Sequence, residues 1–197
     1  MLITDEFEVD HPIDKVWEFF DDIPGVAKCL PGTQLDEEIG PDEYAGGVLI
    51  GLGPVKLEFD GKAKILERND HAKTVKIDAA GAEKKGRGQA QMGVDAGLAS
   101  TLAGTKVTVA MDLNLSGAAA QYGRGLVSDV TAVLLRDFAK NAEARMDAIA
   151  AGRNPDDVVV ASSAPSGFAI GVRAAKLAMM RVIRRFFAPY NPATVGS

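Results

Sequence analysis

Two segments of the chain alternate between apolar and charged or polar side chains, and this pattern restricts the folds open to it. In the first segment Val55, Leu57, Phe59, Gly61, Ala63 and Ile65 alternate with Lys56, Glu58, Asp60, Lys62 and Lys64. Residues 107–115 repeat the pattern with Val107, Val109, Met111, Leu113 and Leu115. Because successive strand residues point to opposite faces, both segments are predicted to be antiparallel strands with one buried and one solvated face.

Other segments complete an alternation of helices and strands. Weaker strand patterns cover residues 2–9, 35–39, 44–52, 74–80 and 88–95. Pro12 is predicted to open a helix, because its missing N–H has no partner at a helix start, and a second short helix is expected over 26–30. A long helix over about 124–151 ends at Gly152. Its predicted buried stripe is Leu126, Val130, Val133, Leu134, Phe138, Ala142, Met146 and Ile149.

The apolar sheet face and the apolar helix stripe must bury each other. We therefore predict one α+β domain over residues 1–151, a curved antiparallel sheet wrapped around the long C-terminal helix. Small residues are frequent in the strand segments: Gly46, Gly47, Gly51, Gly61, Ala63, Ala79, Gly88, Ala90 and Gly93. They are consistent with two readings, a cavity between sheet and helix or merely bends and tight packing.

The charge distribution separates a tail from this body. Residues 158–197 contain five basic residues and no acidic one, whereas the rest holds 17 basic and 27 acidic residues. Residues 152–167 are predicted to be a flexible linker, since they are small, polar and interrupted by prolines. Residues 168–190 are predicted to form an amphipathic helical tail. Its apolar face comprises Phe168, Val172, Met179, Val182, Ile183, Phe186 and Tyr190, and its basic residues are Arg173, Lys176, Arg181, Arg184 and Arg185. Phe187 is also predicted to contact the membrane.

A helix with aromatic and aliphatic residues on one face, basic residues elsewhere and no acids is typical of a membrane interface. Docking in a groove of a partner, or back onto the acidic body, is the competing interpretation. No stretch is apolar enough to span a bilayer, and residues 1–6 do not form a signal peptide. We therefore expect a cytoplasmic protein, peripheral on the inner face of the cell membrane.

Catalytic and metal-binding patterns are missing from the sequence. The chain has two histidines, His11 and His71, and a single cysteine, Cys29, which gives no metal-ligand spacing and no intramolecular disulfide. No convergent acid–base pair or nucleophile motif is present. A net charge of −5 argues against nucleic acid as a partner. The expectation is a protein that is not an enzyme and holds no metal.

Several short runs carry a family resemblance. Cys29-Leu30-Pro31-Gly32, Gly53-Pro54, Phe59-Asp60-Gly61-Lys62-Ala63, Gly104-Thr105 and the stretch 117–124 together resemble the CoxG family, the G subunit of carbon monoxide dehydrogenase. The resemblance covers about residues 1–150. It implies the SRPBCC (START-like, helix-grip) fold, whose members hold lipophilic ligands between sheet and helix. It also implies association with a molybdenum-containing carbon monoxide dehydrogenase or related hydroxylase.

The leading hypothesis combines the predicted cavity with the basic tail: the protein binds a respiratory quinone, menaquinone or ubiquinone, and links the enzyme to the membrane. The predicted cavity lining is Val48, Ile50, Leu57, Phe59, Ile65, Met92, Val109, Met111, Leu126, Val130, Leu134 and Phe138. Tyr122 and Arg124, at the helix entrance, are predicted to contact a head group. The alternatives are an adaptor or maturation factor that carries no quinone, and a small cyclase-like enzyme.

Overall fold

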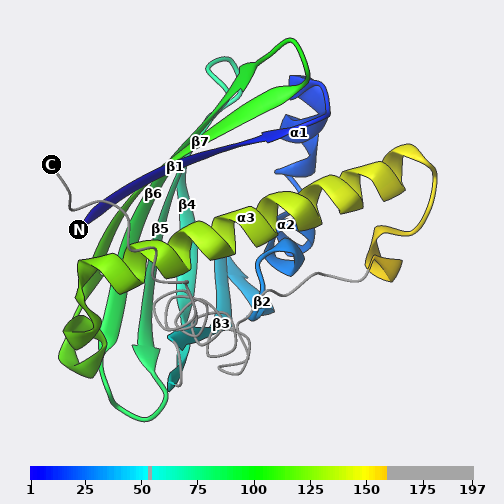
Figure 1. The fold of residues 1–197 in the computed structure, drawn as a ribbon. Helices are drawn as coiled ribbons and strands as arrows, with labels where there is room; N and C mark the ends of the chain where they lie inside the picture. Colours follow the sequence, from blue (N-terminus) through cyan, green and yellow to red (C-terminus); the bar gives the residue numbers. More distant parts are fainter. Residues whose placement is uncertain (53–54, 159–197) are drawn as a thin grey trace, which may run out of the picture. The chain divides into compact units, whose positions relative to one another are not determined.

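The computed structural model describes residues 1–52 and 55–158. Within them, seven antiparallel strands form one curved sheet in the order β1-β7-β6-β5-β4-β3-β2, so β1 and β2 are the edge strands (Figure 1). The strands are β1 (Leu2–Val9), β2 (Thr33–Gly40), β3 (Glu43–Leu52), β4 (Val55–Asn69), β5 (Thr74–Glu83), β6 (Gln89–Ser100) and β7 (Thr105–Leu115). Each strand predicted from alternation is confirmed, most of them with longer bounds.

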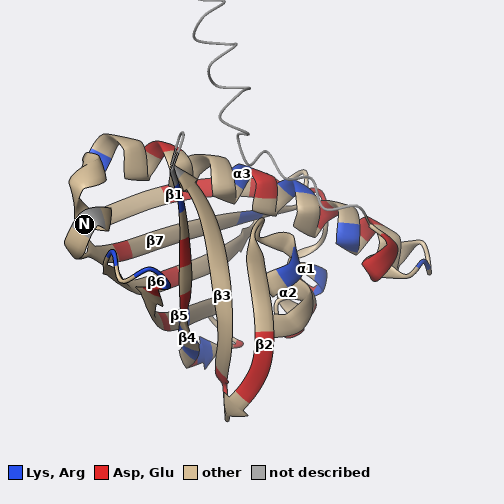
Figure 2. Cartoon of the chain, turned by 90° about the horizontal axis from the view of Figure 1, so that it is seen from below, with Lys and Arg blue, Asp and Glu red and all other residues tan. Residues whose placement is uncertain are grey.

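One long helix lies across a single face of this sheet (Figures 1 and 2). It is α3 (Gly123–Ala150), and a short 3-10 helix, η1 (Gly117–Tyr122), leads into it. Two short helices, α1 (Ile13–Phe19) and α2 (Ile23–Cys29), join β1 to β2. A last 3-10 turn, η2 (Pro155–Asp157), follows α3. The predicted amphipathic helix 168–190, and the predicted linker beyond residue 158, lie outside the described residues.

The buried apolar residues form two separate clusters. The larger joins α1, α2 and the C-terminal half of α3 to β1, β6 and β7, and contains Val9, Val16, Trp17, Phe19, Cys29, Leu98, Val107, Val109, Ala142 and Met146. The smaller contains Leu57, Phe59 and Ala119, near the start of α3. On α3, Val130 packs against the smaller cluster, and Leu135 and Phe138 pack against the larger one.

The start of α2 differs from the sequence prediction, which placed it over 26–30. The helix begins at Ile23, and Pro24 lies in its first turn, where a missing N–H costs nothing. The Asp22 carboxylate accepts a hydrogen bond from the Gly25 N–H at 3.1 Å and caps the helix. Pro24-Gly25 therefore opens α2 rather than separating two helices.

The buried stripe of α3 agrees only in part with the predicted one. Ala142 and Met146 are buried as predicted, whereas Leu126 and Ile149 are exposed, with relative exposures of 38 % and 51 %. The other buried positions are Val127, Thr131, Asp137, Asn141, Arg145 and Ala148. The prediction counted apolar residues only, whereas Asn141 and Arg145 in this stripe are polar and contact α2 or η2.

No helix among the described residues is long and apolar enough to cross a membrane.

Candidate functional site

An apolar cavity of about 360 Å³ lies between α3 and the sheet. Strands β2 to β7 and the N-terminal half of α3 contribute to its wall. On the helix side the lining residues are Val127, Val130, Thr131, Leu134 and Leu135. All three residues of the smaller core cluster, Leu57, Phe59 and Ala119, also line this cavity, so the cavity borders that cluster.

Small residues in register explain why helix and sheet stay apart here. Gly46 of β3 pairs with Gly61 of β4, which pairs with Gly81 of β5, which pairs with Ala90 of β6. In a neighbouring row Ala63 pairs with Ala79. All six line the cavity. Directly opposed residues in antiparallel strands point to the same face, so these rows remove the side chains that would otherwise fill the space.

Some of the glycines also allow close approach of the strands. A Cβ atom on Gly46 would lie 2.4 Å from the Gln34 carbonyl oxygen, and one on Gly61 would lie 2.1 Å from that of Ala80. A Cβ on Gly81 would be only 3.2 Å from the Asp60 oxygen, a contact that a small shift relieves. The two readings left open by the composition, cavity and tight packing, are thus both present in this sheet.

Eight of the predicted lining residues lie on the cavity wall. They are Val48, Ile50, Leu57, Phe59, Met92, Met111, Val130 and Leu134. Alternation along β3, β4, β6 and β7 placed the sheet residues on the correct face. Their role in binding a ligand stays a prediction, since a lining position identifies no ligand.

The remaining six predicted residues are not on this wall. Val109 is part of the larger core cluster. Phe138 packs there too, in an edge contact with Phe7 at 5.9 Å between ring centroids and a stacked contact with Phe20 at 6.3 Å. Ile65 is half-buried further along β4, and Arg124 and Leu126 are exposed. Tyr122 packs against the smaller cluster.

Sequence reasoning missed the part of the wall at and around β2. Thr33 and Leu35 of β2, Leu30 after α2 and Tyr44 of β3 line the cavity. Thr33 pairs with Val48, and Leu35 with Gly46, so both side chains share the inner face. An alternation at Thr33 and Leu35 was available as a signal. It is short, because the register shifts between Leu35 and Glu37.

Few polar atoms border the cavity. The Thr131 hydroxyl donates to the Val127 carbonyl oxygen at 2.9 Å. Thr33 Oγ1 is buried and has no hydrogen-bond partner in the described part of the chain. Burial, followed by the charges of Glu38 and Asp42, raises the pKa of Tyr44. Gln34 and Lys62 also border the cavity, and most of the other lining side chains are apolar. The surroundings therefore suit a mainly apolar molecule.

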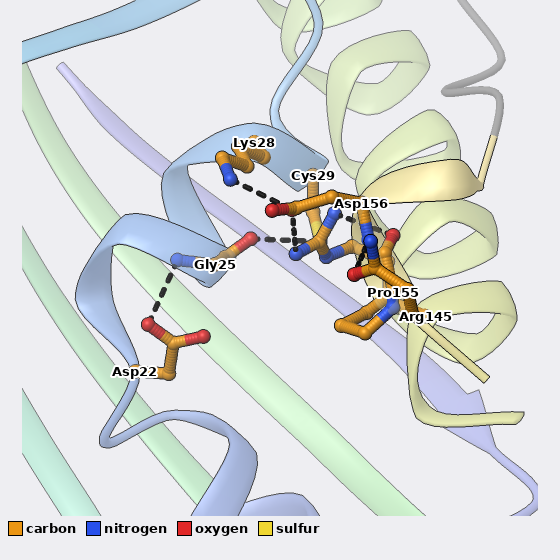
Figure 3. A network of polar contacts seen from close by, with 8 residues as sticks. Asp22, Gly25, Lys28, Cys29, Arg145, Pro155 and Asp156 are labelled. Atoms are coloured by element: carbon orange, nitrogen blue, oxygen red, sulfur yellow. Dashed lines mark hydrogen bonds and ion pairs between the residues drawn. The ribbon is translucent and has the colours of Figure 1, made fainter. Parts of the chain in front are cut away.

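A polar network ties the chain after α3 to α2 (Figure 3). Arg145, only 3 % exposed, donates to the Pro155 carbonyl oxygen at 2.9 Å and to Asp156 Oδ1 at 3.0 Å. Lys28 of α2 reaches the same Asp156 oxygen at 2.7 Å. The first residues of the predicted linker, 152–158, are thus held on the body.

The single cysteine lies beside this network. Asn141 donates to the Cys29 carbonyl oxygen at 3.0 Å, and the thiol donates to the Gly25 carbonyl oxygen at 3.4 Å. Burial raises the pKa of the Cys29 thiol to about 11. A buried thiol with a raised pKa is a poor nucleophile, so Cys29 serves packing. Within the described residues no group of three His, Cys, Asp or Glu side chains could hold a metal ion.

Solved structures with the same fold were found at low sequence identity. A conserved protein from Geobacillus kaustophilus is 22 % identical, with a TM-score of 0.67 over 75 % of this chain and 95 % of that one. The Zhui aromatase/cyclase from Streptomyces sp. R1128 is 16 % identical, with a TM-score of 0.55 over 78 % and 99 % of the two chains. Ara h 8.0201 is 16 % identical, with a TM-score of 0.52 over 75 % and 98 %.

These likenesses confirm the expected helix-grip (START-like) fold of the body. A search of curated proteins found no match. The model of the CoxG family, described as the G subunit of carbon monoxide dehydrogenase, matches residues 6–146, which is more than half of the chain. This span covers most of the sheet, α1, α2 and nearly all of α3, and so includes the elements that form the cavity. The chain therefore belongs to the CoxG family of carbon monoxide dehydrogenase.

Proposed function

We propose that this protein is a non-catalytic accessory protein of a molybdenum-containing carbon monoxide dehydrogenase, and that it carries a respiratory quinone in its cavity. Menaquinone and ubiquinone both fit this role, because each joins an apolar chain to a ring with two carbonyl groups. The observation that carries the proposal is the apolar cavity between α3 and the glycine- and alanine-rich rows of the sheet. Family membership supports the choice of enzyme partner.

The physical reason for carriage is the transfer of hydrocarbon out of water. Burial of apolar surface contributes about 25 cal/mol per Å². An isoprenoid chain brings such surface, and the cavity wall offers aliphatic and methionine side chains such as Ile50, Leu57, Met92 and Met111. A soluble dehydrogenase passes electrons to a quinone that is dissolved in the bilayer, and a carrier of this kind would bridge the two.

The basic tail supports the second half of the proposal, attachment to the inner face of the cell membrane. Residues 158–197 carry five basic and no acidic residues. Each Lys or Arg near an anionic lipid surface contributes about 1 kcal/mol. The tail would hold the carrier where its ligand is dissolved.

The test is a native mass spectrum of the protein purified from its host, with a variant that narrows the cavity. Ala79→Leu adds three carbons to a lining position, whereas Ala82→Leu adds the same group to an exposed position of the same strand. Wild type and Ala82→Leu should carry a lipid of quinone mass. Ala79→Leu should carry at least about tenfold less, since each misfitting methylene costs about 1–3 kcal/mol. Wild-type protein without any bound lipid would end the carrier proposal.

The adaptor alternative has support of its own, because the matched family is described as a subunit of the dehydrogenase. An adaptor would bind the enzyme and the membrane and leave the cavity empty. Two measurements on the Ala79→Leu variant distinguish a carrier from an adaptor. The first is a pull-down assay of its binding to the dehydrogenase, and the second is an electron-transfer assay. An adaptor would sustain electron transfer from the enzyme to membrane quinone with this variant, whereas a carrier would lose that transfer while keeping enzyme binding.

A further inference from the structure

One hydroxyl group on the cavity wall has no partner for a hydrogen bond. Thr33, the first residue of β2, lines the cavity, and its Oγ1 atom is buried without a hydrogen bond to any described residue. A buried hydroxyl of this kind has given up its bonds to water and gained none in exchange, which destabilises the free protein. Because such groups are rare in folded proteins, each calls for an explanation, and a bound ligand supplies one.

The polar side chains on the remainder of the wall differ from Thr33 in being engaged. Thr131 donates to a backbone carbonyl oxygen one turn earlier in α3, at 2.9 Å. Gln34 donates to the Asp36 carboxylate at 3.0 Å. The ammonium group of Lys62 donates to a carboxylate of β3 at 2.7 Å. These three groups are satisfied within the protein, whereas the Thr33 hydroxyl is left for something else.

Strand register places Thr33 at one end of the small-residue row. This row crosses the sheet from β3 to β6 and consists of Gly46, Gly61, Gly81 and Ala90. Leu35 of β2 continues the row at one end, and Leu115 of β7 continues it at the other. Thr33 lies two residues before Leu35, and Tyr44 two residues before Gly46, so their side chains share the inner face and flank the first end. The cavity therefore has hydroxyl groups at its β2 end and leucines at its β7 end.

The charges near the β2 end are negative. Glu38 is opposite Tyr44 in the register of β2 and β3. Its charge and that of Asp42 add to the effect of burial and raise the pKa of Tyr44. The same charges disfavour a carboxylate or phosphate group at this end. They leave a neutral oxygen, such as a carbonyl, as the group best suited to bind there.

We propose that Thr33 determines which ligands bind and how they lie: its hydroxyl donates a hydrogen bond to a neutral carbonyl oxygen at one end of the ligand, and the apolar remainder lies along the small-residue row toward β7. Identifying this oxygen as a quinone carbonyl rests on the proposed function. Rotation of the side chain between its staggered positions turns the hydroxyl without moving the backbone. The head group is thus assigned to the β2 end, and not to Tyr122 and Arg124, which are absent from the wall.

Equilibrium binding of decylubiquinone to the full chain, freed of lipid, tests this assignment. Thr33→Val removes the hydroxyl with little change of shape, Thr33→Ser keeps it, and Thr74→Val is the control at the exposed first residue of β5. Thr33→Val should bind decylubiquinone at least about fivefold more weakly than the wild type, as expected for one hydrogen bond. Thr33→Ser and Thr74→Val should stay within about twofold. The infrared carbonyl band of bound decylubiquinone should lie at a lower wavenumber in the wild type than in Thr33→Val.

Decylbenzene, which has no carbonyl group, shows whether Thr33 acts through its hydroxyl or through its shape. Wild type and Thr33→Val should bind decylbenzene equally. If Thr33→Val lost the same factor of affinity for decylbenzene as for decylubiquinone, the hydrogen bond would be refuted. Equal affinities of wild type and Thr33→Val for decylubiquinone would overturn the proposal as well.

Methyl palmitate and palmitate separate the role of Thr33 from the identity of the ligand. The wild type should bind the neutral ester more tightly than the anion at pH 7, and the reverse order would contradict the proposal. If the ester bound in a manner that Thr33→Val weakens, while decylubiquinone did not bind, the role of Thr33 would stand and quinone carriage would fail. If the wild type bound neither, both proposals would fall together.

Discussion

At the scale of single residues, the glycines of the sheet do not all serve the same purpose. Gly61 is required by backbone packing, because a Cβ there would lie 2.1 Å from the Ala80 carbonyl oxygen. Gly81 lies in the same row, yet its site nearly accommodates a Cβ. Gly93, on β6, has nothing within 4 Å of the position its Cβ would take. Of these three positions, only Gly61 has no room for a Cβ atom.

We therefore expect opposite outcomes from the same substitution. Gly61→Ala should lower the free energy of unfolding by about 1–3 kcal/mol, the usual cost of overpacking. Gly93→Ala should leave it unchanged or raise it by up to about 1 kcal/mol, because alanine restricts the unfolded chain. Urea denaturation of both variants measures the difference. Equal destabilisation would mean that strand propensity, rather than the Ala80 contact, selects glycine at position 61.

A second residue-scale prediction concerns acid stability. Glu83 accepts hydrogen bonds from Arg87 Nε at 3.0 Å and from the backbone N–H groups of Lys85 and Arg87. The bond with the Arg87 side chain is the main reason that the pKa of Glu83 is lowered from 4.5 to about 2. A carboxyl group whose pKa is lower in the folded than in the unfolded chain stabilises the fold when the pH is above its unfolded pKa. This stabilisation is lost as the pH falls from the unfolded pKa to the folded pKa.

The melting temperature of the wild type should therefore fall more steeply than that of Glu83→Gln between about pH 4.5 and 2. At neutral pH the variant should melt lower than the wild type, because the amide gives Arg87 no charge to bind. Glu8→Gln, at an exposed position of β1, is the matched control. If the melting temperatures of wild type and Glu83→Gln fell by the same amount between these pH values, the lowered pKa of Glu83 would be refuted.

At the scale of elements, alternation in the sequence located the strands well, and it placed six of the eight predicted sheet residues on the observed cavity wall. Helical spacing placed Val130 and Leu134 of α3 there too. The apolar pattern missed the polar residues that α3 buries. Asp137, Asn141 and Arg145 are buried, and a pattern of apolar residues leaves polar ones outside. Their burial depends on distant partners: Asn141 donates to Cys29, which is 112 residues away in the chain. Such contacts have no local signature.

The contact between η2 and the body depends on side chains of unequal burial. Arg145 is buried and donates hydrogen bonds to a carbonyl and a carboxylate of η2, whereas Lys28 reaches Asp156 from solvent, with its side chain 53 % exposed. Arg145→Ala should cost about 2–3 kcal/mol of unfolding free energy, because hydrogen bonds to charged groups are lost. Lys28→Ala should cost less than about 1 kcal/mol, as for other surface ion pairs.

Chemical denaturation checks this ranking, with Arg153→Ala as the control at an exposed position without a described ion pair. Hydrogen exchange should also show faster opening of residues 154–158 in Arg145→Ala. If Lys28→Ala proved the more damaging of the two, the ion pair with α2, rather than the contact with α3, would be what holds η2 in place.

At the scale of the whole molecule, the first residues after α3 contact the body, although their composition predicted a linker. Small and polar residues from 152 onward predicted a flexible linker, yet Arg145 and Lys28 hold Pro155 and Asp156 against the body. Asn154 and Pro155 are a local signal for this 3-10 turn, because the Asn154 side chain accepts a hydrogen bond from the Asp156 N–H at 3.0 Å. They do not indicate that the turn is held against the body. What fastens it is a pair of side chains from α2 and α3 that only the fold brings together.

Two truncations test where the body ends. A chain ending at Val158 keeps the partners of Arg145, so its unfolding free energy should match the full chain within about 0.5 kcal/mol. A chain ending at Ala151 lacks Pro155 and Asp156, the hydrogen-bond partners of the Arg145 side chain, so its unfolding free energy should be lower than that of the chain ending at Val158. Both lack the basic segment and should lose most of their affinity for anionic vesicles, at about 1 kcal/mol for each basic residue removed. If the two truncated chains had equal unfolding free energies, the body would end with α3, as the sequence pattern indicated. The contacts of η2 would then contribute nothing to stability.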